Sequence, residues 1–144
     1  MNLTRFSDYS LRVLISAGSY PDRLLTIAEI ATSYQISENH LMKVVHKLAQ
    51  LGILETQRGK GGGLRLACAP QEINLGAVLR QTEQGQPLVE CFDPLHSHCK
   101  IARACQLKQV LYQAEQAFYA ELDRYTLADL LQDRSTLVQI IGLV

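Results

Sequence analysis

The chain has 144 residues, 47% of them hydrophobic, which is enough to bury the core of one compact domain or of a small domain with an added dimerisation element. The 14 basic and 14 acidic side chains balance, so the composition excludes a uniformly basic or acidic protein. The charge is uneven along the chain, because residues 1–65 carry a net +3 and residues 66–144 a net −3, and a polyanion would therefore bind the N-terminal half.

The first predicted elements are two helices. Residues 7–19 repeat apolar side chains at helical spacing, and Ser7 is in position to cap this helix. Thr26 and Glu29 have the spacing of a capping box, which predicts the start of a short second helix. A tight connection then leads from the second helix to the next apolar repeat.

A third helix is predicted after its cap Ser37, with Gly52 at the position of a C-terminal cap. Two short helices joined by a few residues, the second amphipathic and partly basic, are typical of a helix-turn-helix. The candidate DNA contacts at the start and on the outward face of this helix are Ser37, Glu38, Asn39, His40, Lys43 and Lys47. A merely solvated helix face is the alternative, and the next segment argues against it.

That segment predicts a β-hairpin. Two short strands, residues 53–57 and 64–67, flank a glycine-rich basic tip. A hairpin directly after a helix-turn-helix is a wing, in which glycines let the backbone approach phosphates and Arg58 or Lys60 can enter a narrow minor groove. The tip lacks the spacing of nucleotide-binding loops and precedes a strand, which excludes that site. The sequence therefore predicts DNA binding.

Three of the four cysteines, Cys91, Cys99 and Cys105, follow a predicted fourth helix over residues 74–83. Residues 1–10 do not resemble a signal peptide and no apolar run reaches the length of a membrane span, so we expect a cytoplasmic protein without membrane contact. Thiols stay reduced in that compartment, and clustered thiolates then indicate iron–sulfur, zinc or copper(I) chemistry. Ordinary buried cysteines are the alternative.

A long helix is predicted from about residue 102 to residue 125, before a last short helix over residues 126–131. Its near-heptad apolar stripe consists of Leu107, Leu111, Ala114, Phe118, Leu122 and Tyr125. The stripe exceeds what one small domain needs, so we expect a matching helix from a second copy and hence a homodimer. The alternative is that the stripe packs on the first helix of the same chain.

The expected fold is mainly α-helical with a small β-hairpin wing, a winged helix-turn-helix with a long dimerisation helix. We divide the chain into a winged helix-turn-helix DNA-binding domain (residues 1–84), a cysteine-containing sensor loop (85–105), hereafter the cysteine loop, and a dimerisation helix with a C-terminal segment (106–144). Nothing beyond the cysteines and histidines predicts a substrate pocket or an oxyanion site, so an enzyme with a cysteine nucleophile is set aside.

Several segments together resemble the Rrf-two family of bacterial winged-helix regulators, and within it the nitric-oxide-sensing branch. They span nearly the whole chain: residues 3–9, 36–41, 58–63 and 90–92, Cys99, Cys105, and residues 107–108 and 125–130. The resemblance implies a homodimeric repressor that binds double-stranded operator DNA with an intact iron–sulfur cluster. It also implies that nitric oxide is the signal that releases the DNA.

The resemblance also implies a ligand set, in which Cys91, Cys99 and Cys105 bind the cluster and Asp8 of the partner subunit is the expected fourth ligand. In the branch of the family that regulates cluster biogenesis, a histidine follows the third cysteine by three residues, where this chain has Lys108. This departure favours the nitric-oxide-sensing branch and a [4Fe–4S] cluster, with [2Fe–2S] left open.

Other assignments stay open at this point. His96, His98 or an exogenous molecule could replace Asp8 as the fourth ligand. The chain could instead be a regulator that responds to iron–sulfur or redox status, or a zinc-stabilised or thiol-switch winged-helix regulator that uses the three cysteines with one histidine. Cys68 matches no ligand position in the family and is expected to be a buried small apolar residue.

Overall fold

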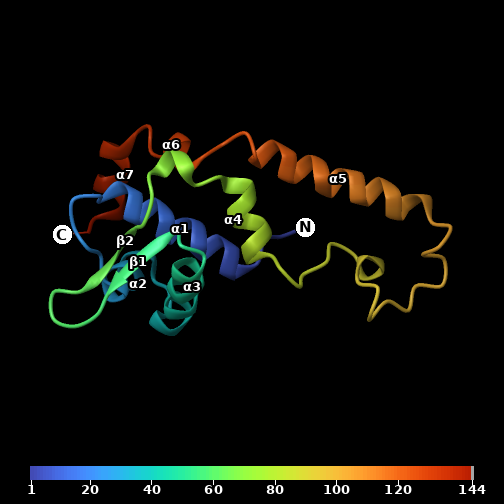
Figure 1. Cartoon of the computed structure of the whole chain (residues 1–144), viewed down its shortest axis with the longest axis horizontal. Helices are drawn as coiled ribbons and strands as arrows, with labels where there is room; N and C mark the ends of the chain where they lie inside the picture. The colour runs from blue at the N-terminus through green and yellow to red at the C-terminus, as the bar shows by residue number, and fades with distance from the viewer. Residues whose placement is uncertain (144) are drawn as a thin grey trace.

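The computed structural model describes residues 1–143 (Figure 1). Helix α1 (Arg5–Ser19) lies at its centre and contacts most of the other helices. Thr4 caps α1, because its hydroxyl accepts a hydrogen bond from the backbone N–H of Ser7 at 3.1 Å. The predicted cap at Ser7 is therefore wrong. Ser7 lies in the first turn with its side chain fully buried, and its hydroxyl is 2.7 Å from that of Thr82.

Helix α2 (Ile27–Tyr34) opens with the predicted capping box. The backbone N–H of Glu29 donates to the Thr26 hydroxyl at 3.2 Å, and the Thr26 N–H donates to the Glu29 carboxylate at 2.7 Å. Gln35 follows in the left-handed region, at φ 54°, which turns the chain sharply toward the next helix. This is the tight connection that a helix-turn-helix requires.

Helix α3 (Glu38–Gln50) begins after Ser37, which occupies the predicted N-cap position, although its side chain makes no capping hydrogen bond in the described structure. The helix ends before Gly52, whose φ of 73° suits a glycine after a helix. The apolar side of α3 joins one core with α1, α2 and the wing. The core members with 1% exposure or less include Val13, Leu14, Leu25, Ile30, Leu41, Val44, Leu48, Leu64 and Leu127. Burial of this apolar surface holds α3 in one orientation on α1.

The wing consists of strands β1 (Leu54–Gln57) and β2 (Gly63–Leu66), which pair antiparallel with Thr56 opposite Leu64. This agrees with the predicted hairpin to within one residue. Leu25 attaches the wing to the rest of residues 1–84, which together with residues 123–143 we call the body. It exchanges two backbone hydrogen bonds with Leu64, at 2.9 and 2.7 Å. The base of the wing is therefore fixed and its tip projects from the body.

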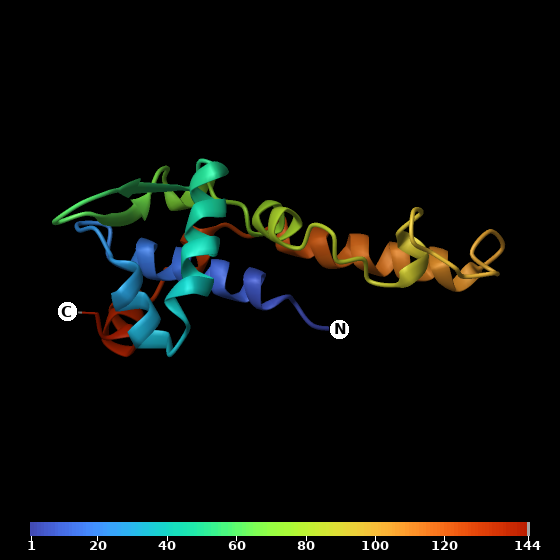
Figure 2. The ribbon, with the colours of Figure 1, turned by 90° about the horizontal axis from the view of Figure 1, so that it is seen from below.

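A 3-10 turn (Pro70–Glu72) leads to α4 (Leu75–Thr82), and the cysteine loop follows with a second such turn at Glu90–Phe92. Helix α5 (Gln106–Leu122) then runs back toward the body. Figures 1 and 2 both show the cysteine loop alongside α5, and together they project from the body as an arm.

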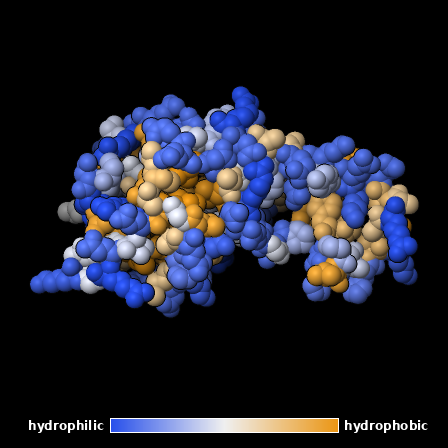
Figure 3. All heavy atoms as spheres, viewed as in Figure 1, coloured by the Kyte–Doolittle hydropathy of each residue, from blue (hydrophilic) through white to orange (hydrophobic). Residues whose placement is uncertain are grey.

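Helix α5 is shorter than predicted at both ends. Cys105 is its N-cap, with the sulfur accepting a hydrogen bond from the N–H of Lys108 at 3.4 Å, so residues 102–105 lie outside the helix. Within residues 1–143 no side chain of α5 is fully buried. Its most exposed large apolar side chains are Leu107, Val110 and Tyr112, at 62%, 58% and 54% exposure. Figure 3 shows apolar surface on this arm as well as on the body.

The base of the arm is joined to α4. Arg80 donates to both carboxylate oxygens of Asp123, at 2.6 and 2.7 Å, and the Asn74 amide donates to the Asp123 backbone carbonyl at 2.7 Å. Only glycine fits at position 76, because a Cβ on Gly76 would collide with the Asp123 carboxylate. Helix α5 therefore packs chiefly on α4, and not on α1 as the alternative interpretation of its stripe would require.

The end of the chain returns to α1 through α6 (Leu127–Leu130) and α7 (Arg134–Ile141). The Tyr20 hydroxyl donates to the Val138 carbonyl at 3.0 Å, and the Ser33 hydroxyl donates to the Ile141 carbonyl. Helix α6 is the predicted last short helix; α7 was not predicted.

The proposed division of the chain at residues 84 and 105 stays a prediction, and residue 144 lies outside the described residues. No helix in the described part of the chain has both the length and the apolar character to span a membrane.

Candidate DNA-binding face and cysteine cavity

The exposed side of α3 carries the predicted DNA contacts. Leu41, Val44, Val45 and Leu48 are buried against the body, which leaves the opposite side of the helix to solvent. The residues placed there are Ser37, Glu38, Asn39, His40 and Lys43, all exposed, and Lys47, which is half-buried. Figure 2 shows α3 lying across α1, with the wing extending from the end of α3.

The wing tip carries the two other predicted contacts. Arg58 and Lys60 are exposed between β1 and β2, on a turn in which the Gly62 N–H donates to the Gly59 carbonyl at 3.0 Å. A side chain on Gly62 would collide with the backbone carbonyl of Gln57. The glycine therefore keeps the turn tight and leaves the two cations as the prominent side chains of the tip.

Arg5 also belongs to this surface, although no sequence pattern predicted it as a DNA contact. A hollow of about 190 Å³ between α1 and α3 is lined by Arg5, Phe6, Tyr9, His40, Lys43 and Val44. The Tyr9 and His40 rings approach to 6.2 Å between centroids across this hollow. We call the exposed residues of α3, the wing tip and Arg5 the DNA face. Packing of α1 on α3 is what brings Arg5 there, and no local pattern reports it.

The structure brings the three predicted cysteine ligands to one cavity. Cys91, Cys99 and Cys105 are free thiols that line a hollow of about 930 Å³ between the cysteine loop and the start of α5, hereafter the cysteine cavity. Among residues 1–143 no three His, Cys, Asp or Glu side chains already stand at metal-binding spacing. Thiolate sulfurs are soft donors of the kind that iron–sulfur groups take as ligands, so the donor set that lines this cavity fits such a group.

Two carboxylates hold the cysteine loop in shape. Asp93 accepts hydrogen bonds from the Leu95 N–H at 2.9 Å and lies 2.7 Å from His96 Nδ1, and Glu90 accepts from the His98 N–H at 2.6 Å. The hydrogen bond from His96, followed by that from Leu95, lowers the pKa of Asp93. The described lining of the cysteine cavity includes neither histidine.

Asp8 lies in the first turn of α1, on the body and not in the cavity of its own chain. Arg12 holds its carboxylate with two hydrogen bonds, from Nε at 3.2 Å and from Nη2 at 2.8 Å. The Arg12 guanidinium also stacks on the Tyr34 ring, 5.7 Å from its centroid. The structure therefore does not bring Asp8 to the cysteines within one chain, and its role as a ligand from the partner subunit stays a prediction.

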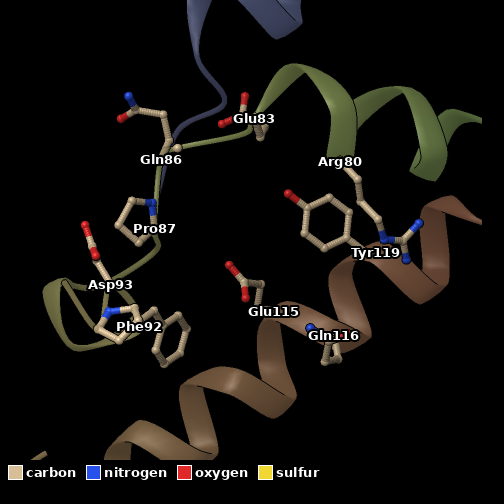
Figure 4. A pocket seen from close by; sticks show the side chains of 11 residues that line it. Arg80, Glu83, Gln86, Pro87, Phe92, Asp93, Glu115, Gln116 and Tyr119 are labelled. Carbon is tan, nitrogen blue, oxygen red and sulfur yellow. The ribbon is translucent and has the colours of Figure 1, made fainter. Parts of the chain in front are cut away.

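A third hollow, of about 550 Å³, lies where the arm meets the body (Figure 4). Glu83 and Glu115 line it, and the Arg80 guanidinium lies 4.8 Å from the Tyr119 ring centroid. Burial, and then the charges of both glutamates, raise the pKa of Tyr119. Glu83 also accepts hydrogen bonds from the backbone N–H and hydroxyl of Thr4, at 2.7 and 2.8 Å. It thus ties the start of α1 to the end of α4.

Cys68 does not line the cysteine cavity. It packs against the core of the body but is half-buried, whereas the sequence predicted a buried residue. Burial, and then the neighbouring carboxylate of Glu72, raise the pKa of its thiol. A protonated thiol is a poor nucleophile and a poor metal ligand. Cys68 therefore behaves as a small packing residue.

Comparison with known proteins agrees with this geometry. Residues 3–133 match the model of the Rrf2 family, described as "Iron-dependent Transcriptional regulator". The chain is 49% identical to the HTH-type transcriptional regulator NsrR of Bacillus subtilis (strain 168) over 142 residues, 98% of this chain and 97% of that protein. It is 46% identical to the regulator of the same name from Halalkalibacterium halodurans, over 99% of both chains.

Solved structures share the fold. The structure titled T. potens IscR superposes with a TM-score of 0.73 at 22% identity, covering 92% of this chain and 88% of the other. Staphylococcus aureus CymR superposes with a TM-score of 0.70 at 24% identity, covering 90% of this chain and 97% of the other. At these identities the likeness concerns the fold alone, and it confirms the predicted winged helix-turn-helix with its long helix.

Proposed function

The chain belongs to the Rrf2 family of transcriptional regulators and is not an enzyme, and we propose that it is an iron–sulfur repressor that senses nitric oxide. The observation that carries this proposal is the convergence of all three loop cysteines on one cavity, in a chain 46–49% identical to regulators named NsrR. The protein acts as a homodimer on double-stranded operator DNA in the cytoplasm.

The DNA face positions the protein on its operator. Helix α3 enters the major groove with Ser37, Glu38, Asn39, His40, Lys43 and Lys47, while Arg58 and Lys60 of the wing reach the adjacent minor groove. The core of the body keeps α3 and the wing in a fixed mutual orientation. In a two-fold dimer the two α3 helices read half-sites ~34–36 Å apart, so the operator is nearly palindromic.

The apolar side of α5 forms the dimer interface. Leu107 and Val110 are more than half exposed, and within residues 1–143 no side chain of α5 is fully buried by its own chain. A second α5 packed against this side removes that surface from water, which is favourable by about 25 cal/mol per Å². For Asp8 of one subunit to reach the cysteine cavity of the other, this packing has to bring α1 beside the partner's arm.

The ligands are Cys91, Cys99 and Cys105, with Asp8 from the partner subunit. An iron–sulfur cluster bound there supplies iron sites that react with nitric oxide. To reach the cavity, Asp8 must give up its two hydrogen bonds with Arg12. A carboxylate suits iron less well than a thiolate, so Asp8 would be the weakest of the four ligands. Because α3 packs on α1, a ligand from α1 would connect the cluster site of one subunit to the DNA face of the other.

A zinc-bound or thiol-switch regulator is the second candidate. It is favoured by the contact between Asp93 and His96 Nδ1, because a carboxylate that orients a histidine is common beside zinc. In that case the DNA face is unchanged and only the signal differs.

Metal analysis decides between the candidates. Anaerobically purified protein is expected to be brown, with sulfur-to-iron charge-transfer absorption and equimolar iron and acid-labile sulfide. An iron content near four per subunit indicates [4Fe–4S], and one near two indicates [2Fe–2S]. Colourless protein with stoichiometric zinc and no iron would contradict the proposal, whether or not the protein binds DNA.

A further inference from the structure

The basic side chains of this chain fall into two groups. Six arginines form ion pairs with carboxylates: Arg12, Arg23, Arg65, Arg80, Arg124 and Arg134. Within residues 1–143 the other eight have no carboxylate at ion-pair distance. Five of these, Arg5, Lys43, Lys47, Arg58 and Lys60, belong to the DNA face, which requires free cations for phosphate.

The remaining three unpaired cations, Lys100, Arg103 and Lys108, all line the cysteine cavity. Glu115 is the one acidic residue in the described lining of this cavity. The two other carboxylates of the loop are occupied, since Asp93 and Glu90 accept hydrogen bonds from the backbone N–H groups of the loop itself. The three cations outnumber the single carboxylate of Glu115, so the described lining of the cavity keeps an excess of positive charge.

The start of α5 adds to this charge. Helix α5 begins at the cavity, and its first-turn N–H groups carry the positive end of the helix dipole. One of them, the N–H of Lys108, already donates to the Cys105 sulfur at 3.4 Å. Cations and a helix N-terminus thus converge on the cysteines, which favours a negatively charged occupant.

We infer that Lys100, Arg103 and Lys108 form an anion-binding rim of the cysteine cavity, which takes a carboxylate beside the three thiolates. The choice of a carboxylate rests on the proposed function, because three cysteines leave a fourth position to fill. Three thiolates and a carboxylate give the site a net negative charge, which the rim balances. A neutral imidazole gains nothing from the rim, so the rim selects Asp8 of the partner subunit over a histidine.

The rim itself can be tested without any metal, in the full-length thiol-reduced apoprotein. Iodoacetate is an anion and iodoacetamide is neutral, and both alkylate a cysteine when its thiolate sulfur displaces iodide. Peptide mass spectrometry gives the rate at each cysteine, and the iodoacetate-to-iodoacetamide ratio cancels differences in thiol reactivity. Cys68, half-buried beside Glu72 on the body, is an internal reference.

We expect the ratio at Cys91, Cys99 and Cys105 to exceed that at Cys68. The triple variant Lys100→Gln, Arg103→Gln, Lys108→Gln should lower it about five-fold at low ionic strength, and 1 M salt, with a Debye length of about 3 Å, should remove most of the difference. The triple variant Lys43→Gln, Lys47→Gln, Lys60→Gln removes the same charge from the DNA face and should keep the wild-type ratio. Equal ratios in all three proteins would overturn the rim.

A second experiment identifies the source of the carboxylate, in anaerobically loaded protein. If Asp8 of the partner subunit supplies it, Asp8→Ala alters the cluster absorption and circular dichroism, and acetate restores them while neutral acetamide does not. The rim variant combined with Asp8→Ala should need several-fold more acetate. If a free carboxylate supplies it, Asp8→Ala leaves the spectra unchanged and acetate shifts those of the wild type.

Two further outcomes separate a failure of the carboxylate assignment from a failure of the proposed function. Acetate without effect in both proteins overturns the carboxylate assignment. Protein that cannot be loaded with iron overturns the proposed function, and the alkylation ratios then still decide whether the rim exists.

Discussion

The DNA face and the cysteine cavity both gather unpaired cations, yet they are built in opposite ways. The DNA face rests on a core in which Leu41, Val44 and Leu48 are at most 1% exposed. The cysteine cavity lies on an arm in which no described residue of α5 is fully buried. Its loop is held by hydrogen bonds that the Asp93 and Glu90 carboxylates accept from backbone N–H groups.

The difference in packing suits the two regions to different tasks, one that needs a rigid surface and one that needs a loop able to change shape. A surface that reads base edges must keep its side chains in one geometry, and a packed core provides that. A site that gains and loses a metal group must change shape, and a loop with few buried apolar contacts opens at low cost. The base of the arm, where Arg80 meets Asp123 and Glu83 meets Thr4, joins the two regions.

Breaking the arm should have the largest effect. Leu111→Glu places a charge in the expected dimer interface, and an unpaired buried charge costs roughly 3–5 kcal/mol. We expect a monomer in sedimentation equilibrium and loss of operator binding. Gln116→Glu adds the same side chain on the other side of α5, where Gln116 lines the hollow at the base of the arm, and should remain dimeric. Wild-type protein that sediments as a monomer at micromolar concentration would refute this interface.

Separating the two regions while both stay folded should have the next largest effect. Asp8→Ala removes the expected link between the cavity of one subunit and the body of the other. The coupling free energy between nitric oxide exposure and operator binding should fall by roughly 1–3 kcal/mol, the usual size of coupling between two sites. Titrations before and after nitric oxide measure it. His96→Ala and His98→Ala should keep the wild-type response, and a full response in Asp8→Ala places the coupling elsewhere.

Changes on the wing test the DNA face alone. Arg58→Ala should weaken operator binding by ~1–3 kcal/mol, because an arginine in a narrow minor groove contributes on that scale. Arg65→Ala, on the same hairpin, removes an arginine already paired with Glu55 and should change affinity little. Fluorescence anisotropy with a labelled operator measures both, and equal losses in the two variants would show that the effect is general to the hairpin.

The smallest expected effect is on salt dependence. Lys43→Ala or Lys47→Ala should reduce the slope of log affinity against log salt by about 1 for each lost phosphate contact. Lys100→Ala removes an unpaired lysine from the cysteine cavity and should leave the slope unchanged. A slope that falls equally for all three lysines would mean that the arm also lies on the DNA.

Much of the fold was predictable because local patterns carry it. The capping box at Thr26, the cap position at Ser37 and the glycine-rich hairpin are each encoded within a few residues. Helix α7 was missed because four of the six residues at 136–141 are β-branched and have weak helix propensity. Hydrogen bonds from the Tyr20 and Ser33 hydroxyls to its backbone carbonyls hold the helix instead. The start of α5 was misplaced because Cys105 acts as a cap, a role that cysteine seldom has.

The candidate sites were predictable to a different extent. The loop cysteines are close in sequence, so their common cavity follows from spacing. Arg5 and Glu83 were missed because tertiary packing places them, Arg5 against α3 and Glu83 against Thr4. The cations around the cavity were visible as residues. Their lack of carboxylate partners within residues 1–143, however, depends on where Glu90 and Asp93 point, which the sequence does not report.

We propose that the state of the cluster controls how tightly the DNA face binds the operator, and a single titration can decide this. Anaerobically loaded protein bound to a fluorescent operator is titrated with nitric oxide while anisotropy and visible absorption are recorded on the same sample. We expect loss of the cluster absorption and release of the operator to follow the same curve, and apoprotein to bind weakly throughout. Operator that stays bound after the cluster absorption has disappeared would contradict it.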